Sequence, residues 1–303
     1  MIRWRSGQRK AQDRGAALIL VVWAVGLMAV IAALIARDAH LDARESKRFR
    51  DALAGDLLIQ AGQRLALARL SQPAEGLSTG FPVVCDMEGG RLLINARPIS
   101  AFVDLNASPE ETLAALFVAL GAAAPDAAGY AARIVDYRDA DTSLSPGGAE
   151  FADYTNAGLA HGPANRPFVR TGEVSEVLGL PPDLVAAMLP HVTVHGFSAQ
   201  VNPLQASKEV LAAAEVLGTS EGLTTDDAAW TQAAEGSPLF AGEPVVIEVI
   251  IQTASGYRTG VAATFGSQDQ ALTGNRPLIE ERAAGPEPVL AAGASLPPPA
   301  PCY

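Results

Sequence analysis

An acidic loop in the middle of the chain carries the residues whose types and spacing best suit chemistry. Side-chain oxygens occur at alternate positions, in Asp139, Asp141 and Ser143, and Glu150 follows eleven residues after the first of them. Calcium-binding loops place their oxygen ligands at this spacing and end with a glutamate. No histidine or cysteine lies in the loop, and an oxygen-only ligand set favours calcium over zinc or copper. The loop is therefore a candidate calcium site.

One position of this loop departs from the pattern of an EF-hand. The sixth position of such a loop is a glycine that makes a sharp turn, and here it is Leu144. This difference argues against a standard EF-hand. Two interpretations stay open from spacing alone: a calcium site of another shape, or a solvated acidic loop, flanked by Asp136 and Asp153, that caps the neighbouring helices.

Residues for nucleophilic or acid–base catalysis form no recognisable motif in this sequence. The four histidines have no serine or cysteine partner at a motif spacing, and the GxSxG, HExxH and P-loop patterns are absent. These histidines are His40, His161, His191 and His195. Glu110 and Glu111 follow a proline at a predicted helix start, where acidic side chains are stabilising. We therefore expect structural roles for these residues and no catalytic site.

An uncharged apolar segment, residues 16–36, indicates how the chain is anchored. As a helix, its 21 residues would span roughly 31 Å, about the thickness of a bilayer's hydrocarbon core. The preceding residues 1–15 contain five basic side chains and one acidic side chain. Basic residues beside a membrane span stay on the cytoplasmic side. We predict a single-pass membrane protein whose N-terminus is cytoplasmic and whose bulk lies across the membrane.

Three fates of the N-terminus are compatible with the sequence. The apolar run is longer than the core of an ordinary secretory signal and continues into a charged helical pattern, which favours retention over removal. The segment could then be an uncleaved anchor. A cut between Gly15 and Ala16 would instead leave the apolar helix as the new N-terminus, and this junction resembles the leader of type IV prepilins and pseudopilins. A glycine before the cut has no Cβ to block a peptidase.

Charge and cysteine content restrict the partners of the remaining chain. The whole chain has a net charge of −11, and the basic leader contributes +4, so the rest carries −15. An acidic surface argues against nonspecific binding to nucleic-acid phosphates. Cys85 and Cys302 are the only cysteines, and without a CxxC motif they support no zinc or redox site. They could pair outside the cytoplasm, but the place of Cys302 in a proline-rich tail argues against pairing.

Periodicity along the chain predicts an α+β protein with a helical insertion. A long helix leads into a hairpin, a helical block follows, and a second hairpin forms around Ser255 and Gly256. Low apolar content and many prolines predict a disordered C-terminal tail. The predicted segments are a leader (1–15), a transmembrane and amphipathic helix (16–71), the first part of the α+β domain (72–103), the helical insertion (104–198), the closing part of that domain (199–267) and the tail (268–303).

The helical block also suggests a competing function. Its repeated turn-and-helix elements, such as DLNASPEETLAAL and VNPLQASKEVLAAA, are typical of helix-hairpin-helix units, which often hold DNA phosphates on backbone amides. A membrane-anchored DNA-binding protein of a competence system is therefore the alternative hypothesis. Glu173, Glu176 and Asp183 lie in this region with few basic groups, which favours packing without nucleic acid.

Several runs together resemble a known family over residues 14–265. They are RGAALILVVWAV, the DLN and VDYRDAD segments, GGAEFADY, ANRPFVRTGEVSEVLGL followed by LPHVTV, and VNPLQASKEVLAA. The chain resembles the minor pseudopilins of type II secretion, the general secretion pathway protein K family. In the last run the usual Asn-Thr is replaced by Pro-Leu. The resemblance implies a pseudopilin-like antiparallel sheet with a large helix-hairpin-helix or SAM-like insertion.

The resemblance further implies location, partners and a metal. It implies a noncatalytic protein in the inner membrane, with a periplasmic domain at the tip of a short pseudopilus, bound to two other minor pseudopilins and processed by the prepilin peptidase. It also implies calcium near the GGAE segment, with Asp139, Asp141 and Glu150 as the best ligand candidates. The family's usual aspartate after this segment is replaced by Phe151, and Asp153 follows as a further candidate.

One substitution in the membrane segment bears on assembly. The family's relatives usually have a glutamate at the fifth position after the cut, where it can neutralise a neighbouring subunit's N-terminal ammonium. Here that position is Leu20. A charge buried in a membrane needs such a partner. We hypothesise that this subunit has no neighbour above it, as expected at a tip.

Overall fold

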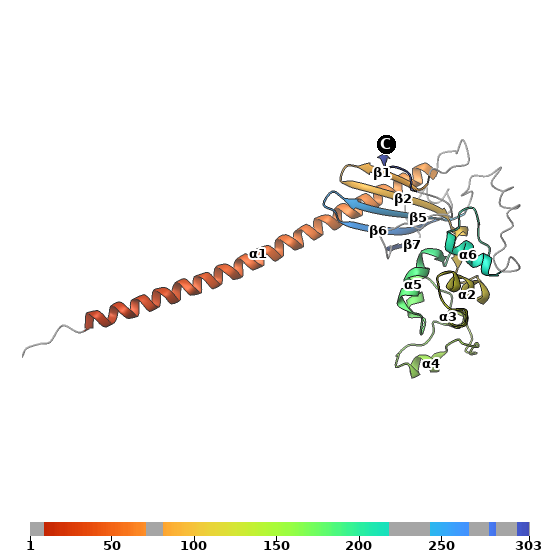
Figure 1. Cartoon of the computed structure of the whole chain (residues 1–303), viewed down its shortest axis with the longest axis horizontal. Helices are drawn as coiled ribbons and strands as arrows, with labels where there is room; N and C mark the ends of the chain where they lie inside the picture. Colours follow the sequence, from red (N-terminus) through yellow and green to blue (C-terminus); the bar gives the residue numbers. More distant parts are fainter. Residues whose placement is uncertain (1–8, 71–80, 218–242, 267–278, 283–295, 303) are drawn as a thin grey trace, which may run out of the picture. The chain divides into compact units, whose positions relative to one another are not determined.

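A long helix, α1 (Arg9–Leu70), forms the N-terminal part of the protein (Figure 1). The computed structural model describes residues 9–70, 81–217, 243–266, 279–282 and 296–302, and gives side-chain surroundings in these ranges except at 9–17 and 279–282. The helix begins before the predicted start at residue 16, because residues 9–14 are mostly good helix formers and one glycine does not end a helix.

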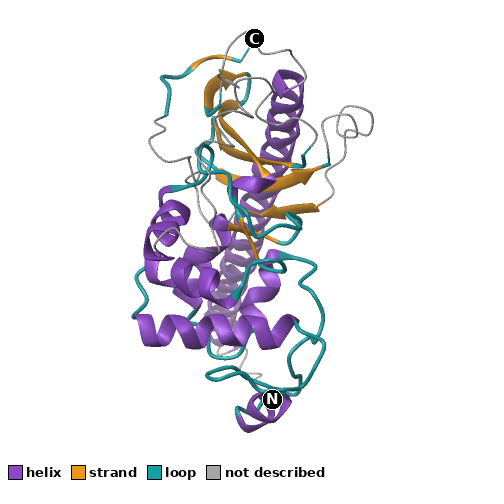
Figure 2. Ribbon diagram, turned by 90° about the vertical axis from the view of Figure 1, so that its right-hand side faces the viewer, coloured by secondary structure: helices purple, strands orange, loops and turns teal. Residues whose placement is uncertain are grey.

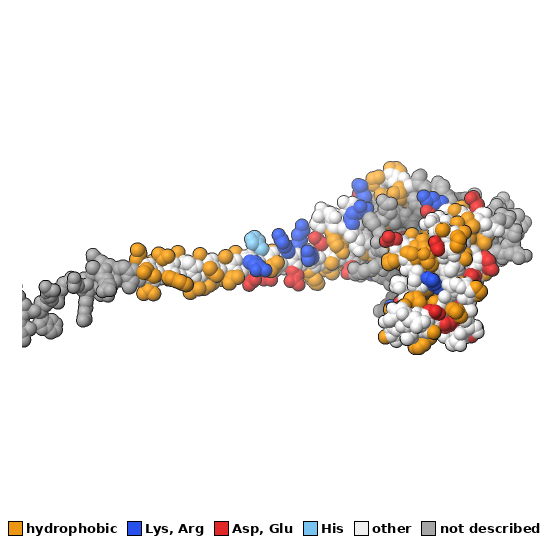
Figure 3. All heavy atoms as spheres, turned by 60° about the horizontal axis from the view of Figure 1, so that its bottom comes forward, with side chains coloured by type: hydrophobic (Ala, Val, Ile, Leu, Met, Phe, Trp, Pro, Cys, Tyr) orange, Lys and Arg blue, Asp and Glu red, His pale blue; other side chains and the backbone are white. Residues whose placement is uncertain are grey.

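The chain divides into two units, Met1–Ala54 and Gly55–Tyr303. In the first unit, an 18-residue window of α1 has a mean hydropathy of 3.0 and is 0% buried, so the helix is long and apolar enough to cross a membrane. Figure 3 shows apolar side chains over this stretch and charged side chains after it. This arrangement agrees with the predicted anchor.

The second unit is built on a six-stranded sheet with the order β7-β6-β5-β2-β1-β8. Both predicted hairpins are present: β1 pairs antiparallel with β2 up to Met87 and Gly90, and β5 pairs antiparallel with β6 up to Gln252 and Arg258. The strand β2 also pairs with β5 along its whole length. The strands are β1 (Val83–Met87), β2 (Gly90–Pro98), β5 (Val245–Thr253), β6 (Arg258–Phe265), β7 (Ile279–Arg282) and β8 (Ala300–Pro301).

The C-terminal part of α1 packs on one face of this sheet. Leu58, Ile59 and Leu67 share a buried cluster with apolar residues of β2 and β5. Gly62 allows the helix to approach closely, because a Cβ there would lie 2.6 Å from a methyl carbon of Val249. This amphipathic half of the helix is therefore an integral part of the second unit.

A block of helices, seen mainly in the lower half of Figure 2, has its own apolar core. Its elements are η1 (Ile99–Ala101), β3 (Val103–Asp104), α2 (Glu110–Ala119), α3 (Ala124–Arg138), α4 (Phe151–Asn156), η2 (Thr171–Glu176), α5 (Pro182–Met188), η3 (Leu189–His191), β4 (Val192–Thr193) and α6 (Lys208–Leu217). The two short strands β3 and β4 pair in parallel. Val210 and Ala213 of α6 belong to this core, so the insertion extends past the predicted boundary at 198.

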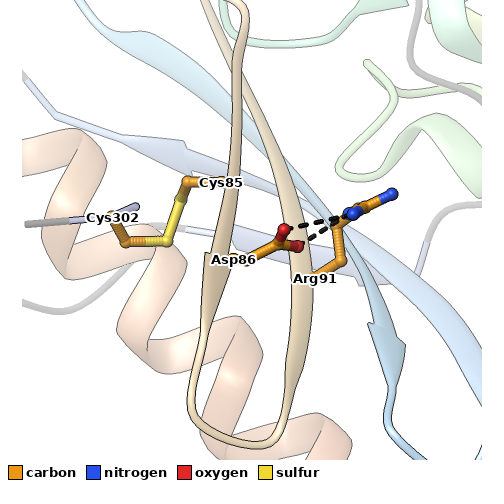
Figure 4. Close-up of a disulfide and its surroundings, with 4 residues drawn as sticks. All are labelled: Cys85, Asp86, Arg91 and Cys302. Carbon is orange, nitrogen blue, oxygen red and sulfur yellow. Dashed lines mark hydrogen bonds and ion pairs between the residues drawn. A yellow bond between two sulfur atoms is a disulfide. The ribbon is translucent and has the colours of Figure 1, made fainter. Parts of the chain in front are cut away.

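The prediction of a disordered tail over 268–303 is wrong for two of its segments. β7 pairs with β6, and β8 pairs in parallel with β1 through Cys85 with Ala300 and Asp86 with Pro301. Cys302 forms a disulfide with Cys85, which corrects the expectation that they do not pair (Figure 4). Composition did not reveal the attachment of β8, because this strand is held at a sheet edge whose Cys85 is 217 residues away in sequence from Cys302.

Candidate metal centre in the acidic loop

The acidic loop joins two helices of the helical block. α3 ends at Arg138, Asp139 begins the loop, and Glu150 immediately precedes α4. The loop turns at its C-terminal end, where the amide of Gly148 donates to the carbonyl of Ser145 at 2.9 Å and Gly147 has a φ of +87°. This turn lies beyond position 144, so the loop does not need the glycine of an EF-hand there.

Three carboxylates converge in this loop. Asp139, Asp141 and Glu150 each offer one oxygen, and these oxygens lie within 4.8 Å of one another. Asp141 is exposed, Asp139 is half-buried and Glu150 is only 7% exposed. The structure thus brings together the three best candidates of the sequence analysis.

The buried oxygens of this cluster lack hydrogen-bond partners. Within the described ranges, Asp139 Oδ1 and both carboxylate oxygens of Glu150 are buried without a hydrogen bond of normal geometry. Glu150 also faces the first-turn amides of α4, where it forms a capping box with Asp153. Unpartnered buried carboxylate oxygens are costly, and a bound cation would satisfy them.

Asp136 is the fully buried member of the site, and the sequence analysis placed it only as a flanking residue. Its Oδ2 accepts hydrogen bonds from the amides of Ser145 at 3.2 Å and Ala149 at 2.9 Å. Its Oδ1 is buried with no partner among the described residues. Gly148 is required beside it, because a Cβ there would lie 1.9 Å from Oδ2. From its buried position at the end of α3, Asp136 therefore holds the C-terminal part of the loop through these two hydrogen bonds.

Asp153, the fourth predicted ligand, has a different role. Its Oδ2 accepts a hydrogen bond from the amide of Glu150 at 2.9 Å, which caps the first turn of α4. It is not a member of the three-carboxylate cluster. Because Asp153 lies in the first turn of α4, its side chain is directed at the start of that helix and not into the loop.

Burial and mutual repulsion disfavour ionisation of the cluster. Burial, followed by the charges of Asp141 and Asp136, raises the pKa of Asp139 above its usual value. Burial, followed by the charges of Asp136 and Asp139, likewise raises the pKa of Glu150. A cation would reverse this effect, because it stabilises the ionised carboxylates. The donor set therefore fits a hard cation such as calcium.

The segment after α4 braces this loop, and the sequence analysis gave it no role at the site. The side-chain amide of Asn165 donates to the carbonyl of Asp141 at 3.1 Å, and its backbone amide donates to the carbonyl of Tyr137 at 3.0 Å. Three residues later, Phe168 stacks on the ring of Tyr137 at 4.9 Å between centroids. The Asn-Arg-Pro-Phe run marks this segment in the sequence, but the run alone does not show which atoms it contacts.

A comparison with known families places this arrangement within a matched segment. Residues 93–196, which include the acidic loop and the Asn-Arg-Pro-Phe run, match the family model described as type II secretion system (T2SS), protein K. Over these residues the chain is similar to the type II secretion protein K family. This similarity agrees with the minor pseudopilin family predicted from the sequence, and the matched segment begins in β2 and ends just after β4.

Individual members of the protein K family are distant relatives. The type II secretion system protein K of Pectobacterium carotovorum subsp. carotovorum is 26% identical over 222 residues, which are 64% of this chain and 68% of that protein. A chain in the crystal structure of the GspK-GspI-GspJ complex from the enterotoxigenic Escherichia coli type 2 secretion system has a TM-score of 0.52 and 17% identity, over 82% of this chain and 100% of that one. This likeness confirms the predicted α+β fold.

The residues predicted for processing and assembly lie on α1. Gly15 and Ala16 fall within the helix, in the part whose side chains the structure does not describe. Leu20 is 70% exposed, as the surrounding apolar residues are. A lipid or protein environment would cover this surface in the membrane.

One histidine cluster has the residue types of a catalytic triad. His191 Nδ1 lies 2.8 Å from Ser207 Oγ, and His191 Nε2 lies 3.9 Å from Glu209. Ser207 is fully buried and its Oγ accepts from the amide of Val210 at the start of α6. Burial lowers the pKa of His191 to about 4, so the ring is neutral. These contacts connect His191 of η3 to the start of α6, which is a structural role.

Proposed function

We propose that this protein is a noncatalytic minor pseudopilin at the tip of a type II secretion pseudopilus, where it supports protein export across the outer membrane. The match of residues 93–196 to the protein K family carries the proposal. The fold likeness to a chain solved as part of a GspK-GspI-GspJ complex supports assembly with two other minor pseudopilins. The apolar part of α1 would hold the subunit in the inner membrane before assembly.

The proposal includes an orientation and a processing step. The basic leader stays in the cytoplasm, and the second unit lies in the periplasm. The disulfide between Cys85 and Cys302 supports this assignment, because disulfides persist in oxidising compartments such as the periplasm. The prepilin peptidase cuts between Gly15 and Ala16. Leu20 then carries no charge for a neighbouring ammonium, in keeping with a tip position.

A calcium ion in the acidic loop is the second part of the proposal. Asp139, Asp141 and Glu150 would hold it, with Asp136 supporting the loop from inside. When bound, the ion supplies positive charge that neutralises the carboxylates. The carboxylates connect the end of α3, the loop and the start of α4, so the bound ion would fix these three segments in one arrangement. This arrangement would form a surface of the helical block for binding to partner subunits.

The DNA-binding alternative has weaker support. The chain holds 33 acidic and 22 basic residues, and the family match names a secretion component. Salt-dependent DNA binding by the full chain would favour the alternative, because phosphate contacts weaken steeply with salt.

Mass spectrometry of the membrane-extracted protein tests the proposal directly. The chain is produced in cells with and without the prepilin peptidase, and the mass of its N-terminal peptide is measured. We expect an N-terminus at Ala16 only when the peptidase is present. An intact Met1 form that still supports secretion would overturn the proposal.

A further inference from the structure

The C-terminal residues cover one edge of the sheet. β1 pairs with β2 on one side, and on its other side Cys85 and Asp86 pair in parallel with Ala300 and Pro301 of β8. The bond from Cys302 to Cys85 fixes this short strand in place (Figure 4). Two paired residues alone would hold a strand weakly, so the covalent bond is the main attachment.

An uncovered β1 would be able to recruit another strand. Edge strands present unpaired amides and carbonyls, which are a template for pairing with a second chain. The segment that covers β1 cannot continue the sheet in the same way. Its prolines, Pro297, Pro298, Pro299 and Pro301, have no amide hydrogen to donate. A strand of this composition ends a sheet instead of extending it.

The covering segment is also anchored in the core. Cys85 is 1% exposed and Cys302 is 8% exposed, and both belong to the apolar cluster between α1 and the sheet. Leu67 and Leu70 of α1 and Val83 of β1 lie in the same cluster. A buried disulfide exchanges slowly with solvent thiols, so the attachment persists once formed unless excess reductant is supplied.

We propose that residues 296–302 are a disulfide-locked cap that closes the β1 edge against pairing with a second copy of this chain. The cap forms when the thiols of Cys85 and Cys302 reduce one external disulfide, which becomes two thiols as the protein disulfide forms. The source of oxidising equivalents is a disulfide of a dithiol oxidase or of an oxidised small thiol in the compartment. The capped subunit then meets its partners through other surfaces.

Hydrogen exchange on the full chain in detergent micelles tests the cap. The test variant is Cys85→Ala with Cys302→Ala, which leaves no polar group in the apolar cluster. Exchange is measured by mass spectrometry in peptides that cover β1 and, as an internal reference, β5. We expect the β1 amides that do not face β2 to exchange at least about tenfold faster than in the native chain while β5 stays protected. Light scattering should show dimers that increase with protein concentration.

A titration of the native chain with reductant removes the dependence on a variant that could misfold. We expect β1 exchange and dimers to appear while β5 is still protected. Equal loss of protection in β1 and β5 would overturn the proposal, because the bond would then hold the whole domain and not an edge. A reduced chain that keeps β1 protected and stays monomeric would overturn it as well. Neither result depends on the secretion function.

Discussion

At the scale of single residues, the acidic loop combines carboxylates that the sequence places together with others that it does not. The spacing of Asp139, Asp141 and Glu150 predicted a cluster, and the three side chains do converge. The burial of Asp136 and the bracing contact of Asn165 could not be predicted, because both depend on how the loop turns back over α3. For the same reason the sequence did not show that Asp153 Oδ2 caps α4.

Removal of one buried charge should separate calcium binding from folding. In Glu150→Gln we expect calcium affinity to fall at least about tenfold, because a carboxylate ligand is replaced by a neutral amide. Without calcium, the variant should unfold at a higher temperature, since Glu150 no longer buries an unpaired charge. Calorimetric titration and thermal unfolding measure the two effects. Glu215→Gln, at an exposed site on α6, is the matched control and should change neither.

The raised pKa values of Asp139 and Glu150 make a signed prediction about pH. Because each carboxyl binds its proton more tightly in the folded state, the calcium-free protein should gain stability as pH falls from neutral into the range of these raised values, and the gain is lost as pH rises through them. Calcium affinity should change in the opposite direction and fall with acidification. Denaturant unfolding at several pH values, with calcium and with chelator, measures both trends. Parallel trends in the two conditions would contradict the assignment of a cation to this cluster.

A methyl group at Gly148 should disrupt the support that Asp136 gives the loop. The Cβ of Gly148→Ala would lie 1.9 Å from Asp136 Oδ2, so the loop must shift. We expect the free energy of unfolding to fall by about 1–3 kcal/mol, as for overpacking elsewhere. Gly172→Ala is the control, because no atom lies within 4 Å of the added Cβ. An equal, small effect of both substitutions would show that the loop is not held in the way described.

At the scale of elements, the helical block is tied together by one buried carboxylate. Asp104 Oδ1 accepts from the amides of Asn106 at 2.6 Å and Ala107 at 3.0 Å, and Oδ2 accepts from Gly196 at 2.6 Å and Phe197 at 2.9 Å. The turn before α2 and the segment after β4 are therefore joined at one side chain. These segments are about ninety residues apart, and sequence periodicity predicted each of them but not their contact.

Asp104→Asn should reveal how much this junction contributes. The amide group directs a donor at backbone amides that also donate, so at least one buried amide loses its acceptor. We expect the free energy of unfolding to fall by roughly 2–3 kcal/mol, measured by denaturant unfolding. Asp183→Asn at the exposed first turn of α5 should cost much less. Comparable losses in the two variants would contradict the role given to Asp104.

At the scale of the whole molecule, the sequence predicted those elements whose structure depends on a single continuous stretch of chain. The apolar helix and both hairpins depend on local periodicity, and all three are present. The attachment of the tail depends on a disulfide between residues 217 apart in sequence, so its composition alone led to the wrong prediction of disorder at β8. The placement of α6 in the helical block also depends on tertiary packing, against the α2 side of that core.

Assembly tests the central claim at this scale most directly. The full chain is co-produced with the prepilin peptidase and with the two other minor pseudopilins of the same secretion system, and the membrane extract is analysed by native mass spectrometry. The proposed function predicts a complex that contains one copy of each of the three subunits. A chain that stays alone in the presence of both partners, with calcium supplied, would contradict it.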